Sequence, residues 1–375
     1  MEKKINNYID TINPVIKDYY KILSEDYPDF LDDYINTPRM QKQDAITCSR
    51  GEYYSKIYNI DLWYSSLEHS IAVALVIWHF THDKKQTLSG LFHDISTPAF
   101  KHCIDYMYGD YEKQEFTEDL TKTMIMESKE IMSLLKRDNI DIEEVCDYHI
   151  YPIADNDTPM LSADRLEYTL SNGLGQIKKI WDLDEIKKIY SDITIVEKED
   201  GTPEMCFNTL EIADRFVEVM SELSILYMDD KARFGMEFIA EIMKKMSKLG
   251  LITVSDLYEL SEKEIIEKIK NTKDYNISKC FKIWHEGSDV KTSDKVVKDK
   301  YCVNVKAKKR YINPLVKTKN GIKRIADVSE KAKDNIQKCL DYSFDRYVYM
   351  DFNFDYNKKV LTKKNNKKFV IDTNM

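Results

Sequence analysis

The sequence predicts an all-α main body followed by a small α+β appendage. Helical periodicity recurs through the first 290 residues, one long apolar run has the length of a helix, and alternating apolar and basic residues follow residue 290. The chain has 375 residues, 43% of them hydrophobic and 32% charged, which is typical of a globular protein with a substantial core. We therefore divide it into a helical domain over 1–290 and a basic α+β region over 291–375.

The longest apolar run extends from Leu67 to His82. Its sequence, LEHSIAVALVIWHFTH, is apolar nearly all round, which indicates a helix inside a helical core rather than on a surface. Thr97 and Pro98 are suited to the cap and the first residue of a later helix, which Gly109 would end. Together with these two, the predicted helices cover the following ranges: 67–82, 87–94, 97–109, 117–137, 141–149, 160–171, 208–249 and 262–271.

Extended structure is predicted in three segments. ITIVEKEDGTPEMCF contains Asp200-Gly201 between two short extended runs, which is typical of a hairpin. In the tail, YCVNVKAKKRYINPLV and RYVYMDFNFD alternate with period two, and Asn320-Gly321 supplies a turn.

Charge is divided unevenly between the two regions. Residues 291–375 contain 22 Lys+Arg against 10 Asp+Glu, a net +12, whereas the remainder carries −21. This asymmetry is consistent with an anionic partner such as nucleic acid, but a solvated surface or a tail docked on the acidic body is the simpler interpretation.

The sequence predicts a cytoplasmic protein that does not enter a membrane. Its first residues have no apolar core of signal-peptide length, and no stretch approaches about 18 uninterrupted apolar residues. Seven cysteines are scattered without a C-x-x-C pair, so we expect reduced thiols rather than a thiolate metal site.

One dense cluster of potential metal ligands is present. Three of the five histidines between residues 69 and 102 have acids beside them: His69, His93 with Asp94, and His102 with Asp105. Imidazole and carboxylate groups without thiolate suit a divalent ion such as Mn, Fe, Ni, Zn or Mg, and spacing does not choose among these. A lone histidine is more often a satisfied core residue, so the clustering carries the hypothesis.

The motifs resemble those of a known superfamily. SLEHSIAVALV, followed 24 residues after His69 by LFHDIS and later by LSADRLEY, resembles the H…HD…D signature of the HD superfamily of metal-dependent phosphohydrolases. That resemblance implies an all-α HD-domain core. In the superfamily, ligands from separate helices hold a divalent metal, which implies four here: His69, His93, Asp94 and Asp164.

Within this superfamily, the chain is most similar to the deoxynucleoside triphosphate triphosphohydrolases. INTPRMQK at 35–42 resembles their I-D-T-P-x-F-Q-R segment, HDISTPAFKHCID resembles H-D-x-G-H-x-P-F-x-H-x-x-D, and ADRLEY resembles V-D-[KR]-x-D-Y. The resemblance covers residues 35–320 and is strong at the motifs. It implies that His102 and Asp105 belong to the phosphate pocket, with Asp105 orienting or sharing a proton with an acid or base, and that Arg165 and Tyr168 contact phosphate.

Three departures from the family concern its polar groups. Thr97 stands where the family usually has histidine, and Ser66 stands where an arginine commonly binds the substrate. FTED at 116–119 replaces a catalytic histidine, and Glu118 is a candidate substitute, although an acidic first-turn residue is the simpler interpretation. Losing two cationic contacts predicts weak triphosphate binding or a less charged phosphoester substrate, unless a neighbouring subunit's basic tail supplies replacements.

We therefore expect a homo-oligomeric, metal-dependent phosphohydrolase acting on a nucleotide or another phosphorylated small molecule. A (d)NTP triphosphohydrolase is the specific hypothesis, and 5′-nucleotidase and cyclic-nucleotide phosphodiesterase activities stay open. The alternative is a catalytically altered HD protein that binds nucleotide or nucleic acid as a regulator.

Overall fold

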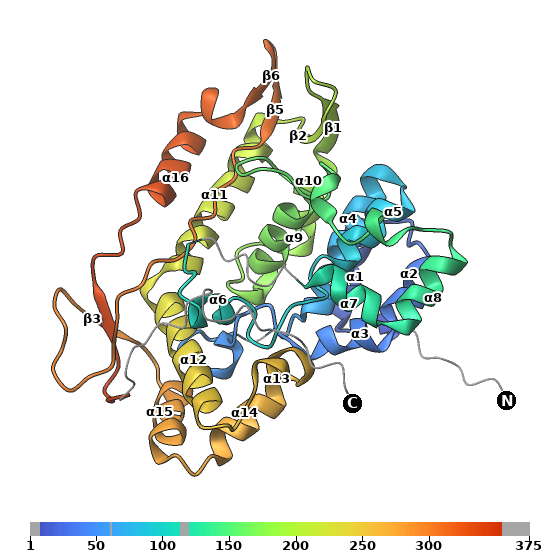
Figure 1. Ribbon diagram of the computed structural model, residues 1–375. Coiled ribbons are helices and arrows are strands. Elements are labelled where there is room, and N and C mark those ends of the chain that lie inside the picture. Colours follow the sequence, from blue (N-terminus) through green and yellow to red (C-terminus); the bar gives the residue numbers. More distant parts are fainter. Residues whose placement is uncertain (1–7, 61, 113–119, 355–375) are drawn as a thin grey trace.

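The computed structural model describes residues 8–60, 62–112 and 120–354. Within these ranges it contains 16 α-helices and seven short strands, and Figure 1 shows their arrangement. Most buried apolar side chains belong to one continuous core. The prediction of a mainly helical protein with a small α+β part is confirmed. The assignment of the helical part to the HD class stays a prediction.

The centre of the fold is helix α4 (Ser66–Thr81), the predicted apolar helix. All its residues from Ser66 to Ile77 are buried, as a helix that is apolar nearly all round requires. Its start is fixed by reciprocal hydrogen bonds between Ser65 and Glu68, a capping box. Helix α5 (Lys84–Phe92) packs against α4 at Gly90, where an added Cβ would lie 2.2 Å from Ile77 Cδ1.

Other helices surround this pair, and two predicted long helices are each divided in two. The predicted helix over 208–249 is divided at Asp229, which caps the second helix by accepting the Ala232 N–H. The predicted helix over 117–137 is divided at Ser128, which caps the second helix by accepting the Ile131 N–H. The remaining bounds are α1 (Pro14–Leu23), α2 (Phe30–Ile35), α3 (Pro38–Lys42), α7 (Thr121–Glu127), α8 (Lys129–Arg137), α9 (Ala163–Ser171), α10 (Leu183–Ser191), α11 (Leu210–Met228), α12 (Asp230–Lys248), α13 (Val254–Glu259), α14 (Glu262–Asn271), α15 (Tyr275–Glu286) and α16 (Glu330–Leu340).

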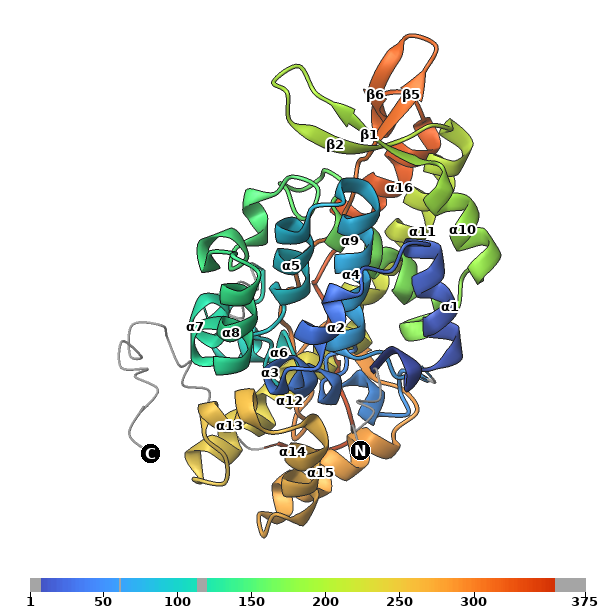
Figure 2. The same cartoon turned by 90° about the vertical axis from the view of Figure 1, so that its right-hand side faces the viewer.

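Two hairpins form one four-stranded sheet at one end of the molecule, opposite α14 and α15 (Figure 2). Strand β1 (Ile193–Glu197) pairs with β2 (Pro203–Phe207), and β5 (Leu315–Thr318) pairs with β6 (Gly321–Arg324), both antiparallel. The hairpins join through a parallel pairing of β2 with β5. The hairpin predicted at Asp200-Gly201 is therefore confirmed, and so is the turn predicted at Asn320-Gly321, where the φ of +99° at Gly321 favours glycine.

The C-terminal region packs closely on the helical part. Helix α16 lies along α11 (Figure 1), and a second sheet has the strand order β3 (Lys291–Ser293), β7 (Tyr347–Tyr349), β4 (Cys302–Val303). The buried Arg233 of α12 donates hydrogen bonds to the carbonyl oxygens of Val305 and Arg346. The division at residue 290 stays a prediction.

The predicted helix over 97–109 is wrong in its first half. The helix α6 spans only Cys103–Met107, because Phe100 and Lys101 have φ values of +63° and +45° in the left-handed region. Distant groups hold this turn: Leu257 O accepts the Ala99 N–H and Glu262 Oε1 accepts the Phe100 N–H. Local sequence preferences do not register such tertiary contacts.

The predicted helix over 141–149 is also wrong. Only two 3₁₀ turns form there, Ile142–Glu144 and Tyr148–Ile150. Each turn is capped by a preceding aspartate, Asp141 or Asp147, whose side chain accepts a backbone N–H two residues later. Such local bonds compete with helix formation.

Among the described residues, no helix combines the length and the apolar character that a membrane crossing requires. All seven cysteines are free thiols in the structure, in agreement with the sequence-based expectation.

The buried Glu262 generates a prediction about stability and pH. Burial raises the pKa of its carboxyl to about 8, although the Phe100 N–H lowers it. The pKa of this carboxyl is thus about 8 in the folded protein and 4.5 in the unfolded chain. The protonated carboxyl contributes its full stabilisation below pH 4.5, and this contribution is lost as the pH rises to about 8.

Glu262→Gln should remove this dependence while it keeps an oxygen to accept the Phe100 N–H. Urea unfolding of both proteins at pH 5 and pH 8.5 should show the wild type losing about 1 kcal/mol or more relative to the variant over this range. An equal change in unfolding free energy between pH 5 and pH 8.5 in the two proteins would contradict the assignment.

Candidate metal centre

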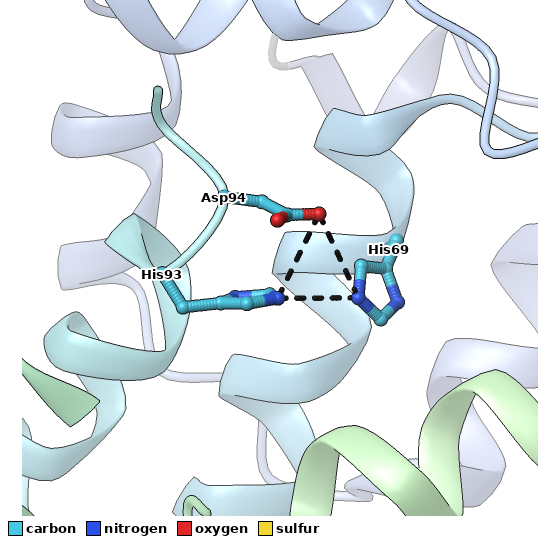
Figure 3. Close-up of side chains that lie close together, drawn as sticks. All are labelled: His69, His93 and Asp94. Atoms are coloured by element: carbon cyan, nitrogen blue, oxygen red, sulfur yellow. Dashed lines mark hydrogen bonds and ion pairs between the residues drawn. The ribbon is translucent and has the colours of Figure 1, made fainter. Parts of the chain in front are cut away.

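Three of the predicted ligands lie close together, as Figure 3 shows. The Nε2 atoms of His69 and His93 are 3.2 Å apart, and Asp94 Oδ2 lies 4.0 Å from the first and 3.8 Å from the second. His69 belongs to the first turn of α4, whereas His93 and Asp94 follow the last residue of α5. One potential ligand atom from each residue lies within 4.8 Å of the others.

The fourth predicted ligand reaches the same place from α9. Asp164 lies in the first turn of this helix, whose start is capped by Ser162 accepting the Arg165 N–H. Asp164 Oδ1 is 3.2 Å from His69 Nε2 and 3.8 Å from His93 Nε2. The fold thus brings together all four side chains that the resemblance implied.

The outward nitrogens of both imidazoles have partners. His93 Nδ1 lies 2.7 Å from the carbonyl oxygen of Gly90, and His69 Nδ1 pairs with Glu167. Glu167 is itself fully buried and accepts a hydrogen bond of 2.6 Å from the Tyr64 hydroxyl. Such outer partners fix the ring orientation and leave Nε2 as the inward ligand atom.

Glu167 is a residue that the sequence interpretation left without a role. It belongs to the quoted motif ADRLEY, three residues after Asp164, and so lies on the same side of α9. This spacing lets one helix contact both nitrogens of His69, through Asp164 on Nε2 and Glu167 on Nδ1. The signal for this role in the sequence was an acidic residue three positions after a candidate ligand.

Both ligand carboxylates are held in the ionised form. Burial would raise the pKa of Asp94, but the Lys101 ammonium at 2.6 Å and the nearby imidazoles lower it well below its ordinary value. Burial is likewise outweighed at Asp164, whose pKa is lowered by its hydrogen bond with His69. Two carboxylates and two converging Nε2 atoms form a donor set that fits a divalent ion of the borderline or hard kind.

His102 and Asp105 form a pair next to this cluster. His102 Nδ1 is 3.0 Å from Asp105 Oδ2, and Asp105 is fully buried at the start of α6. Burial lowers the pKa of His102 well below its ordinary value, and the charges of Arg310 and Lys101 lower it further. The imidazole is therefore neutral, with Nδ1 oriented by Asp105. The third predicted catalytic residue, Glu118, lies outside the described residues.

The two predicted phosphate contacts differ in their surroundings. The guanidinium of Arg165 is bonded to Asp155 at 3.0 Å and to Asn156 Oδ1 at 2.8 Å, so it braces the segment before α9. Tyr168 lines the cavity that contains the metal cluster, and burial raises its pKa to about 12, which keeps the hydroxyl available as a donor. A phosphate role for both residues stays a prediction.

The cavity over the cluster has a volume of about 150 Å³ and contains cations that the sequence interpretation missed. These residues are Arg50, Lys101, Lys308 and Arg310. Arg50 pairs with the buried Glu52, and Lys101 pairs with the half-buried Asp94. The estimate of cationic contacts from sequence was therefore incomplete, because these residues are far from the motifs along the chain.

Comparisons with known proteins support the fold but do not name an activity. No protein-family model matches the chain. It is 26% identical over 270 residues to the uncharacterized protein YdhJ of Bacillus subtilis (strain 168), a match that covers 71% of this chain and 78% of that protein. A crystal structure of a hypothetical protein from Aquifex aeolicus superposes with a TM-score of 0.60 at 15% identity, over 87% of this chain and 93% of that one. The chain therefore shares its overall fold with that protein.

Proposed function

We propose that this protein is a metal-dependent phosphohydrolase of the HD type that acts on a nucleotide. The observation that carries the proposal is the convergence of two imidazoles and two ionised carboxylates from three separate parts of the chain on one cavity. His69, His93, Asp94 and Asp164 would hold the ion. A bound divalent ion lowers the pKa of coordinated water and neutralises phosphate charge.

The chain's own residues have separable tasks in this proposal. Neutral His102, oriented by Asp105, accepts or returns a proton at Nε2 during hydrolysis. Lys101 keeps Asp94 ionised, and Glu167 keeps His69 oriented. Three tyrosines, Tyr148, Tyr168 and Tyr227, also line the cavity and provide aromatic surface for a nucleoside.

A (d)NTP triphosphohydrolase stays the specific hypothesis. The expectation of a less charged phosphoester was based on Ser66 and Thr97 replacing cationic residues. Lys308 and Arg310 also line the cavity, so the chain has cationic groups there that this count of losses did not include, and the preference for a less charged phosphoester stays a prediction. A regulatory role for the protein, with or without a metal, would require binding of nucleotide or nucleic acid without turnover.

The first prediction of this proposal concerns metal content. Protein purified without chelator should contain a divalent metal by elemental analysis, and the double variant His93→Ala, Asp94→Ala should lose it. The loss should also lower the unfolding temperature, because the ion binds the folded state. Asp184→Asn, an exposed carboxylate of α10, is the matched control and should keep the metal. Equal metal content in the double variant and the wild type would refute the ligand assignment.

A second prediction separates a positioning role for Glu167 from simple packing. Glu167→Gln preserves the volume but removes the charge that pairs with His69 Nδ1, so metal affinity should fall by about 10- to 100-fold. Competition with a chromogenic chelator measures this, and circular dichroism should show an unchanged fold. Wild-type affinity in the glutamine variant would contradict the role.

The third prediction tests the reaction itself. A phosphate-release screen over nucleotides with Mn, Mg, Fe, Co and Ni should identify a substrate. Activity should vanish in Asp164→Ala and fall about 100-fold in Asp105→Asn, which cannot orient His102 as the carboxylate does. Asp184→Asn should retain full activity. Full activity in Asp164→Ala would eliminate the mechanism.

A further inference from the structure

A second cavity adjoins the cavity over the metal cluster. It has a volume of about 170 Å³, and its lining includes His149 and Asp155. Asp164 and Tyr168 line both cavities, whereas His102 lines the first cavity and His149 the second. One candidate metal ligand, Asp164, therefore borders both cavities, and each cavity has a histidine of its own.

The two histidines are oriented in the same way. His102 Nδ1 lies 3.0 Å from Asp105 Oδ2, and His149 Nδ1 lies 2.9 Å from Asp147 Oδ1. Asp147 also accepts the backbone N–H of His149, which starts the 3₁₀ turn Tyr148–Ile150. The same aspartate thus fixes the backbone and the ring of His149. In both histidines an aspartate at Nδ1 leaves Nε2 as the nitrogen that can exchange a proton with a ligand.

The surroundings of the two Nε2 atoms differ. Arg310 Nη2 lies 3.4 Å from His102 Nε2, so a donor faces this nitrogen, and burial lowers the pKa of His102 well below its ordinary value. His149 Nε2 instead faces a carboxylate, Asp155 Oδ2, at 3.4 Å. An ionised carboxylate only accepts hydrogen bonds, so the His149 ring carries hydrogen on both nitrogens. His102 is therefore placed to accept a proton, and His149 is placed to donate one.

The contact between His149 and Asp155 leaves the Nε2 proton available. Its length of 3.4 Å exceeds the roughly 2.7 to 2.9 Å of a strong charge-assisted hydrogen bond. Burial raises the pKa of Asp155, and the Arg165 guanidinium, bonded to it at 3.0 Å, lowers that pKa. Asp155 thus already has a cationic partner. The His149 side chain is 48% exposed and lines the second cavity, so a group bound there can take the place of Asp155 at Nε2.

Hydrolysis of a nucleotide phosphoester needs both kinds of histidine. The attacking and leaving oxygens lie roughly in line, on opposite sides of phosphorus. Water must lose a proton on one side, and a sugar oxygen on the other side departs as a strongly basic alkoxide unless it receives one. Two histidines in two cavities that share Asp164 satisfy this requirement.

We propose that His149 is the general acid that protonates the departing sugar oxygen, while His102 accepts the proton of the attacking water. The inference rests on the proposed phosphohydrolase function and adds a catalytic residue to it. A bond forms between the water oxygen and phosphorus, and the bond from phosphorus to the sugar oxygen breaks. The sugar oxygen leaves with the electron pair and takes the proton from His149 Nε2. Exchange with solvent then restores the proton on His149 and removes the one on His102.

Two probes with different leaving groups test this role in the full-length, metal-loaded protein. Release of deoxyguanosine from dGMP and dGTP requires a protonated sugar oxygen, whereas p-nitrophenyl phosphate releases a stabilised phenolate that leaves without a proton. His149→Gln should lower kcat for nucleoside release by about 100-fold and kcat for p-nitrophenyl phosphate by less than about threefold. Asp147→Asn, which still caps the turn, should give a smaller loss of about tenfold, again with the nucleotides alone.

The matched control is His82→Gln. His82 is also paired with an aspartate, Asp26, and its side chain is 60% exposed, but it lines neither cavity, so both rates should stay at the wild-type value. Elemental analysis should show unchanged metal content in every variant, because His149 is not a proposed ligand.

Two results would overturn the inference. One is wild-type nucleoside release in His149→Gln. The other is an equal loss with both leaving groups, which would mean that His149 acts through binding or folding rather than by donating a proton. Failure of the proposed function gives a different result, since the wild type itself would then release nucleoside from neither nucleotide.

Discussion

The structure depends on placing two ionised carboxylates and two imidazoles in a helical core. Charged groups in such a place are costly unless they are paired, and each one here has a partner. Lys101 pairs with Asp94, His69 lies between Asp164 and Glu167, and the Tyr64 hydroxyl satisfies Glu167. The apolar helix α4 and its neighbours supply the low-dielectric surroundings that make these pairings strong. Removing one member of such a network leaves its partner without compensation, which costs stability.

The turn between Asp94 and His102 shows how distant residues position this network. Its backbone enters the left-handed region at Phe100 and Lys101, which is unfavourable for residues other than glycine. Gln43 Nε2 donates to Ile95 O, and Glu262 accepts the Phe100 N–H. Segments far apart in the chain therefore stabilise the backbone of the turn. The turn in turn directs the Lys101 ammonium to Asp94. The stability of α14 and the electrostatics of the site are thereby coupled.

The four candidate ligands could be predicted from sequence because each lies in a locally recognisable setting. His69 opens an apolar helix, His93 and Asp94 end one, and Asp164 follows a serine cap. The supporting residues could not be predicted in the same way. Their roles come from tertiary proximity, as for Glu262, or from a segment without regular structure, as for Lys308 and Arg310. The helix expected over 97–109 failed for the same reason, since contacts with Leu257 and Glu262 determine that backbone.

The uneven charge of the sequence takes a definite form over residues 305–311 of the tail. The tail is basic and the rest of the chain acidic, and composition alone favours a solvated surface or docking on the acidic body over a nucleic-acid partner. In this segment the basic side chains turn to the body of the same molecule: Lys306 pairs with Glu112, Lys309 bonds to Leu340 O, and Lys308 and Arg310 line the cavity. Arg233 and Ser224 donate hydrogen bonds to carbonyl oxygens of the segment, so contacts with the main body position these side chains.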